Sequence, residues 1–181
     1  MGITTKGEVG QVWQLKGKTG FIVTKAAPVL ALLLLAGCSL PTYVDPIGSE
    51  TATLTFHNAD TATILVYGFK VGEDCSGGEV LFNSDARLYP NKDRDITVAA
   101  GRAFSFYFRR MKPTSYGFLD CRMPTTLVPK PGGRYIARFS ASDAMCRVVV
   151  SQVTPEGEKP EPTFRLRRWR SPLTGAGSYC R

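Results

Sequence analysis

Histidine is almost absent from the 181-residue chain, and this scarcity excludes several kinds of chemistry. The single histidine is His57, in Phe56-His57-Asn58-Ala59-Asp60, so a Ser-His-Asp arrangement would depend on it alone. We expect His57 to be a turn residue that ends a strand. The five cysteines show no CxxC or Cys/His spacing, so we expect no metal site and no cofactor. No spacing joins two carboxylates into an acid–base pair, and no glycine-rich loop opens a helix, so we expect a binding protein and not an enzyme.

Long hydrophobic runs are also missing. The longest apolar stretch, Ala26 to Ala36, has eleven residues and contains Pro28. A helix that crosses a membrane needs about 20 apolar residues. The length is instead typical of the apolar region of an export signal, and it predicts a chain that is delivered outside the cytoplasm.

A short motif follows this stretch at Leu35-Ala36-Gly37-Cys38. It resembles the lipobox of bacterial lipoproteins. The resemblance implies that a signal peptidase cuts between Gly37 and Cys38 and that Cys38 carries a diacylglyceryl group and a palmitate-like acyl chain. Ser39 stands where aspartate would favour the inner membrane, which implies the outer membrane, on its periplasmic face. The mature protein would be a domain held to the membrane by its lipid.

The region before the apolar run is unusually long, because signal peptides usually total about 15 to 30 residues and 37 residues precede Cys38. Two explanations stay open. Residues 1–37 could form one signal peptide with a long basic N-terminal region, or translation could start at Val23, so that residues 1–22 are not part of the protein.

The net charge is +8 for the whole chain. The leader through Gly37 contributes four lysines and one glutamate, so the mature part carries +5. A basic surface favours anionic partners such as lipid headgroups, cell-wall carboxylates or an acidic protein. We expect no nucleic acid partner, because nucleic acid belongs to another compartment.

Residues 38–50 contain two prolines and no periodicity, which predicts a short tether. Residues 51–153 show about eight short strand patterns separated by turn signals, typical of an antiparallel β-sandwich of immunoglobulin-like or transthyretin-like kind. A small closed β-barrel is the alternative. Two strands around Ala100-Gly101 are predicted to form a hairpin, and Pro124 predicts an edge or bulged strand over Phe118 to Val128.

The alternation of side chains predicts the core of this domain. Phe104, Phe106 and Phe108 share one strand face, because side chains in a strand repeat every two residues. The strand from Arg134 to Ser140 likewise places Tyr135, Ala137 and Phe139 inward. Each fully buried phenylalanine could contribute about 2 to 3 kcal/mol.

Four cysteines remain when Cys38 carries lipid, and an even number suits an oxidising compartment. Four cysteines allow three pairings. Cys121 and Cys146 should fall near the same end of the sheet if the turns at Gly132-Gly133 and Asp143 are consecutive. We therefore predict Cys121 with Cys146, and Cys75 with Cys180.

Residues 154–181 begin with a proline-rich stretch, predicted to be an exposed linker over 154–162. A basic segment from Phe164 to Arg170 follows. One interpretation is an anion-binding strip, since guanidinium groups pair bidentately with phosphates and carboxylates. The other is an edge strand with Phe164 and Leu166 inward and solvated arginines outward. The candidate anion-binding residues are Arg165, Arg167, Arg168, Trp169 and Arg170.

These features together predict a lipid-anchored envelope protein that acts by binding. The leading hypothesis is an accessory or assembly lipoprotein that docks to other envelope proteins. The alternative is a periplasmic ligand-binding or inhibitor module that recognises an anionic glycan, lipid A or a hydrolase.

Overall fold

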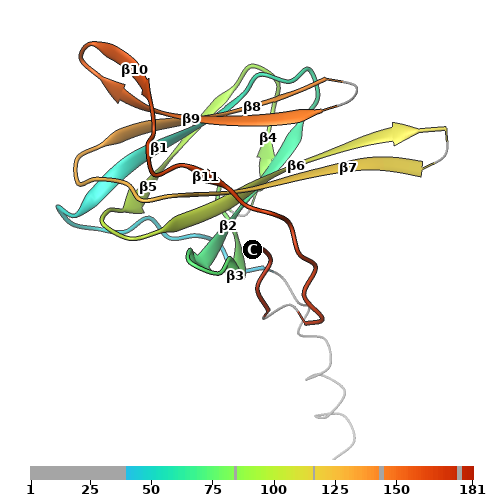
Figure 1. Ribbon diagram of the computed structural model, residues 1–181, viewed down its shortest axis with the longest axis horizontal. Coiled ribbons are helices and arrows are strands. Elements are labelled where there is room, and N and C mark those ends of the chain that lie inside the picture. The colour runs from blue at the N-terminus through green and yellow to red at the C-terminus, as the bar shows by residue number, and fades with distance from the viewer. Residues whose placement is uncertain (1–39, 84, 116, 143–144, 175–176) are drawn as a thin grey trace, which may run out of the picture. The chain divides into compact units, whose positions relative to one another are not determined.

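The computed structural model describes residues 40–83, 85–115, 117–142, 145–174 and 177–181 (Figure 1). These residues form eleven strands in two sheets. The strands are β1 (Thr51–Asn58), β2 (Ile64–Val71), β3 (Ser76–Val80), β4 (Arg87–Leu88), β5 (Asp93–Ala99), β6 (Phe104–Thr114), β7 (Gly117–Leu127), β8 (Arg134–Ala141), β9 (Cys146–Thr154), β10 (Gly157–Pro160) and β11 (Arg165–Leu166).

The sheets are a five-stranded one in the order β10-β9-β8-β1-β5 and a six-stranded one in the order β11-β7-β6-β2-β3, with β4 beside β2. They form an all-β sandwich, which confirms the predicted fold class, and they do not close into the alternative barrel. All pairs of strands are antiparallel except β1 with β8. Among the described residues no helix has the length and apolarity needed to cross a membrane.

The core lies between the two sheets, where the alternation in the sequence predicts it. Phe106 and Phe108 of β6 are fully buried, and Phe104 is nearly so. The ring of Phe56 from β1 meets the ring of Phe106 edge to face, with centroids 4.9 Å apart. Phe139 of β8 packs on Phe108 from the same opposing sheet. The predicted inward positions in both sheets are confirmed, because a two-residue period leaves each side chain only one face to occupy.

The connection through Ala100-Gly101 differs from the prediction. The strands on its two sides do not pair, because β5 belongs to the five-stranded sheet and β6 to the six-stranded sheet. Gly101 takes a φ of +73°, which glycine adopts without strain. The turn therefore carries the chain across the sandwich. A tight turn between two strands looks the same in sequence whether or not the strands pair.

The proline-rich stretch 154–162 is not a linker. It contains β10, which pairs with β9 from Gly157↔Thr154 to Pro160↔Ser151. Pro160 ends this edge strand, a position where its missing N–H costs little. The sandwich thus extends beyond the predicted limit at residue 153.

The predicted tether is also part of the domain, at least over its described residues. The backbone of Tyr43 donates to the Val80 carbonyl at 2.8 Å, and Val80 donates to the Pro41 carbonyl at 2.9 Å. Thr97 of β5 donates to the Asp45 carboxylate at 3.2 Å. Residues 41–45, which we call the strap, therefore bridge β3 at the edge of one sheet and β5 at the edge of the other.

Candidate functional site

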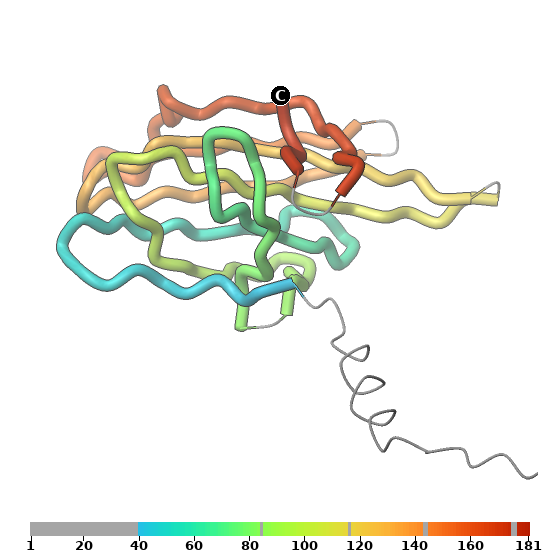
Figure 2. The backbone as a smooth tube through the Cα atoms, turned by 90° about the horizontal axis from the view of Figure 1, so that it is seen from below, coloured from blue at the N-terminus to red at the C-terminus, as the bar shows by residue number. Residues whose placement is uncertain are grey.

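The β6–β7 hairpin is longer than the sheet that supports it. The two strands pair along their whole length, from Phe104↔Leu127 to Thr114↔Gly117. On one side, β2 accompanies β6 only as far as Arg109, and on the other, β11 meets only Thr125 and Thr126 of β7. Residues 110–121, which we call the arm, have no further strand beside them in the described structure. Figures 1 and 2 both show this yellow hairpin projecting past the rest of the sandwich.

The base of the arm is fixed by covalent and ionic links. A disulfide joins Cys121 of β7 to Cys146 of β9, and so joins the two sheets. Arg110 pairs with the buried carboxylate of Asp60, in the connection between β1 and β2. Asn58 accepts a hydrogen bond from the Asp60 backbone N–H at 2.9 Å and holds this connection in place. The arm is therefore rigid where it leaves the sandwich.

The arm exposes apolar side chains beyond this base. Phe118 is 74% exposed, Leu119 is 54% exposed and Met111 is 47% exposed. Phe118 and Met111 lie on the outer face of the hairpin, whereas Leu119, opposite Lys112, lies on the inner face. Met145, also exposed, lines a shallow hollow of about 280 Å³ with Leu119. Apolar surface of this kind, rimmed by charged residues, marks interaction sites in soluble domains.

A charged cluster lies at the outer base of the arm. Arg109 donates two hydrogen bonds to the Asp120 carboxylate, each at 3.0 Å, and Arg122 donates one at 2.8 Å. Partial burial raises the pKa of Asp120, but the hydrogen bonds from Arg109 and Arg122 outweigh it and hold the pKa below its usual range. The guanidinium of Arg122 also lies 4.7 Å from the centre of the Trp169 ring.

The predicted cysteine pairs are both present, Cys121 with Cys146 and Cys75 with Cys180. The second pair fixes the C-terminal residues 167–181, which we call the tail, to the turn between β2 and β3. Trp169 and Tyr179 of the tail pack on Tyr107 and Phe69, on the outer face of the six-stranded sheet. The tail thus covers aromatic residues that the sheet would otherwise expose.

The predicted anion-binding residues do not form one continuous strip. Arg167 is half-buried and donates to the Glu73 carbonyl at 3.2 Å, and Trp169 packs on Tyr107. The side chains of Arg165, Arg168 and Arg170 are exposed. An anion-binding role for these five residues stays a prediction.

The edge strand predicted in this basic segment is only partly right. Phe164 packs against the core, but Leu166 is exposed, because β11 pairs with β7 over two residues only and its alternation ends there. Pro124 belongs to the same edge. Its carbonyl accepts from Arg167, so its missing N–H falls on the side of β7 away from β6.

His57 lies within β1 and is not a turn residue. Its Nδ1 is 2.6 Å from the Asp93 carboxylate across the β1–β5 pair, and not beside Asp60, which binds Arg110. No cluster of three or more histidine, cysteine or acidic side chains that could hold a metal occurs in the described residues. The predicted cleavage and lipidation residues, Gly37 and Cys38, lie outside the described part of the chain.

The exposed residues of the arm were not predicted from the sequence. The sequence predicts only an edge or bulged strand over Phe118 to Val128. The signal was present nevertheless, because Phe118 and Leu119 are adjacent and adjacent side chains in a strand point to opposite faces. One of the two therefore had to face away from any core.

Comparison with models of known protein families, with curated proteins and with solved structures finds no match for this chain.

Proposed function

We propose that the protein is a lipid-anchored envelope protein that docks to a partner protein of the envelope through the arm. The observation that carries this proposal is the arm itself, a hairpin fixed at its base whose apolar end pairs with no further strand in the described structure. The lipobox-like motif supplies the anchor, and the two disulfides suit an oxidising compartment.

The arm has the properties of a binding element. Aromatic and methionine side chains are enriched at protein interfaces, and Phe118 and Met111 supply them here. Because the disulfide and the Arg110–Asp60 pair already fix the base, docking needs to order few further residues. A partner would cover apolar surface on both faces of the hairpin, so it would present a groove and not a flat surface.

The anchor would leave the arm free to reach a partner. The mature chain would be attached through Cys38, three residues before Pro41, where the strap joins the domain. Three residues span at most about 10 Å. The domain would therefore stay close to the membrane, with the arm extending along the long axis of the sandwich (Figure 2).

Site-specific cross-linking tests the docking proposal. A photo-reactive amino acid at position 118 or 119 of the full-length chain, expressed in its own envelope, should give one reproducible protein adduct. The matched control is position 166, because Leu166 is 52% exposed and Leu119 is 54% exposed. Equal adducts at positions 119 and 166, or no adduct at the arm, would contradict the proposal.

Substitution sharpens the same test. Phe118→Ser and Leu119→Ser should each weaken partner capture about 30-fold, the effect of an interface residue worth about 2 kcal/mol. Leu166→Ser should leave capture unchanged. Capture through an apolar contact should persist at high ionic strength, whereas binding through the exposed arginines should weaken.

The anchor is tested separately by the intact mass of the protein extracted from membranes. We expect a chain that begins at Cys38 and carries diacylglyceryl and acyl groups. An unacylated chain that begins upstream of Cys38 would overturn the anchoring half of the proposal.

A further inference from the structure

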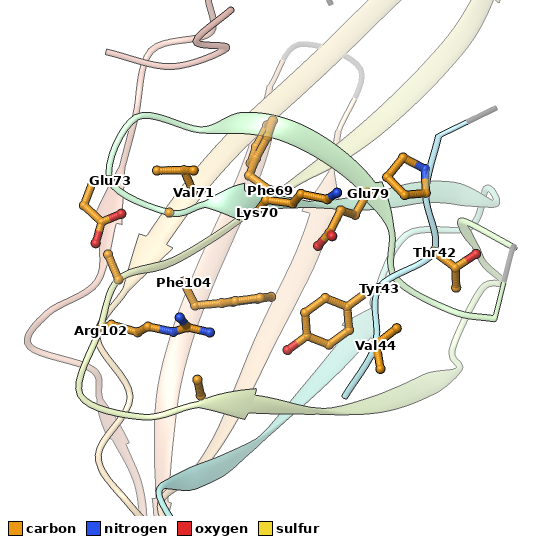
Figure 3. Close-up of a pocket in the computed structure, with 14 residues that line it drawn as sticks. Thr42, Tyr43, Val44, Phe69, Lys70, Val71, Glu73, Glu79, Arg102 and Phe104 are labelled. Atoms are coloured by element: carbon orange, nitrogen blue, oxygen red, sulfur yellow. The ribbon is translucent and has the colours of Figure 1, made fainter. Parts of the chain in front are cut away.

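The strap leaves a cavity beside it at the seam between the two sheets. The cavity has a volume of about 580 Å³, within the range of small-molecule sites. One wall comes from the ends of β2 and β3, the other from the connection between β5 and β6, and Tyr43 of the strap closes one side (Figure 3). Gly72 permits this arrangement, because a Cβ there would lie 2.1 Å from the Ala103 carbonyl oxygen.

Aromatic rings line the inside of this cavity. Phe104, which is nearly buried, and Tyr43 meet edge to face with centroids 5.8 Å apart. The Tyr43 hydroxyl donates to the Thr97 carbonyl at 2.8 Å, and burial raises its pKa, so it stays protonated and its ring stays in place. These two rings thus give part of the cavity a fixed apolar wall.

Glu79 is the unusual residue of the cavity. It is only 9% exposed, and within the described structure its carboxylate has no hydrogen-bond donor and no ion pair. Burial raises its pKa, and the more distant charge of Lys70 offsets this only in part. Figure 3 shows the carboxylate directed into the cavity, toward the rings of Phe104 and Tyr43. A buried carboxylate beside aromatic faces is the usual environment for an ammonium group.

Arg102 faces Glu79 from the opposite wall. Its guanidinium is directed into the cavity in Figure 3 and forms no ion pair in the described structure. The four charged residues that line the cavity are two acids, Glu73 and Glu79, and two bases, Lys70 and Arg102. A simple anion or a simple cation would gain no net attraction from this set, whereas a ligand that carries both charges matches it.

We propose that the cavity binds a phosphoethanolamine group, with the ammonium against Glu79 and Phe104 and the phosphate on Arg102. The source of this group is argued from the strap. Pro41 lines the cavity three residues after Cys38, so a lipid anchor would hold the cavity opening within about 10 Å of the membrane. The assignment to a phospholipid headgroup therefore rests on the proposed anchor, whereas the binding chemistry does not.

The binding test uses the mature domain without its lipid, exported behind a cleavable signal so that its disulfides form. The two sheets, the core and both disulfides lie within residues 40–181, so this chain contains the whole domain. Titration calorimetry with phosphoethanolamine should show saturable binding. Ethanolamine, inorganic phosphate and glycine should each bind at least tenfold more weakly, since each lacks the phosphate, the ammonium or the spacing between the charges.

Paired substitutions locate the site. Glu79→Gln and Arg102→Gln should each weaken phosphoethanolamine binding at least tenfold. The matched controls are Glu156→Gln and Arg147→Gln, which alter exposed residues that do not line the cavity and should bind as the parent does. The proposal would be overturned by loss of binding in the controls or by glycine binding as tightly as phosphoethanolamine. It would also be overturned if the unsubstituted domain unfolds cooperatively, and is therefore folded, but does not bind phosphoethanolamine.

Vesicles distinguish the source of the headgroup. Phosphatidylcholine vesicles containing phosphatidylethanolamine should recruit the unlipidated domain, and pure phosphatidylcholine vesicles should not. Binding of free phosphoethanolamine without recruitment to vesicles would overturn the lipid source. Because this domain lacks Cys38 and keeps the arm intact, its failure to bind leaves the cross-linking and mass measurements, and therefore the docking function, unaffected.

Discussion

The outer face of the β6–β7 hairpin is covered by the tail near the sandwich but is exposed in the arm. Near the sandwich, Tyr107 is covered by Trp169 of the tail, with ring centroids 4.9 Å apart. A few residues further, Met111 and Phe118 are exposed. The tail thus covers apolar surface of the sheet and is fixed there by the Cys75–Cys180 disulfide, but it does not extend over the arm. Apolar residues left uncovered beside such a segment are available for a partner.

The first prediction concerns a variant in which the tail is released, so that the covered part of the hairpin becomes exposed as the arm is. Replacing Cys75 and Cys180 together by serine opens a loop with a sequence separation of 105 residues. The chain-entropy model gives a loss of about 5 kcal/mol in the free energy of unfolding. Trp169 is the only tryptophan of residues 38–181, so in a protein of those residues its fluorescence should shift to the red as the ring leaves Tyr107. The measurement is urea unfolding with and without the substitutions.

An unchanged fluorescence maximum in that double variant would mean that packing alone holds the tail. Replacing Cys121 and Cys146 provides the control. Their loop has a separation of 25 residues, so the loss should be smaller, about 3.5 kcal/mol. The environment of Trp169 should not change.

The second prediction compares two phenylalanines of the same hairpin. Phe106 is fully buried, and Phe106→Ala should cost about 3 to 5 kcal/mol by removing a ring and leaving a cavity. Phe118→Ala, in the arm, should change stability by less than about 0.5 kcal/mol. Unfolding midpoints in urea measure both. A loss of more than about 1 kcal/mol at Phe118 would show that its ring stabilises the fold, which would weaken its assignment to binding.

The third prediction loosens the base of the arm. Asp60→Asn leaves Arg110 without its charged partner in a largely buried position, which should cost about 3 kcal/mol. The matched control is Asp93→Asn, which removes the exposed pair with His57 and should cost less than about 0.5 kcal/mol. Cross-linking from the arm should also fall in the Asp60 variant, since a mobile hairpin must be ordered when it binds. Unchanged cross-linking would mean that the disulfide alone positions the arm.

The sequence predicts what depends on local patterns. Alternation places Phe104, Phe106 and Phe108 in the core, and the order of the turns predicts both cysteine pairs. The sequence cannot show where a strand extends beyond the strands beside it. This depends on the register of β6 with β2, which is set by residues far apart in the chain. For the same reason the strap looked like a tether, since its hydrogen-bond partners Val80 and Thr97 lie outside its own sequence.

The cavity was missed for a related physical reason. Glu79 directly follows two glycines, and nothing in its local sequence indicates that its carboxylate is buried. Burial of a charged side chain is a tertiary property. The same applies to Asp60, which stood beside the only histidine in sequence yet pairs with Arg110, 50 residues away.

The smallest expected effect concerns Asp120, at the boundary between the covered and the bare part of the hairpin. Its hydrogen bonds from Arg109 and Arg122 hold its pKa below the usual value despite partial burial. A carboxylate whose pKa is lower in the folded than in the unfolded state stabilises the protein above its unfolded pKa, about 3.9, and this contribution is lost as the pH falls through the folded pKa. Asp120→Asn should therefore cost about 1 kcal/mol or less at pH 7, because the group is partly exposed. The difference from the parent should therefore shrink in urea unfolding curves as the pH falls below about 3.9 toward the folded pKa. If it does not shrink, Asp120 stabilises the hairpin through its hydrogen-bond geometry and not through its charge.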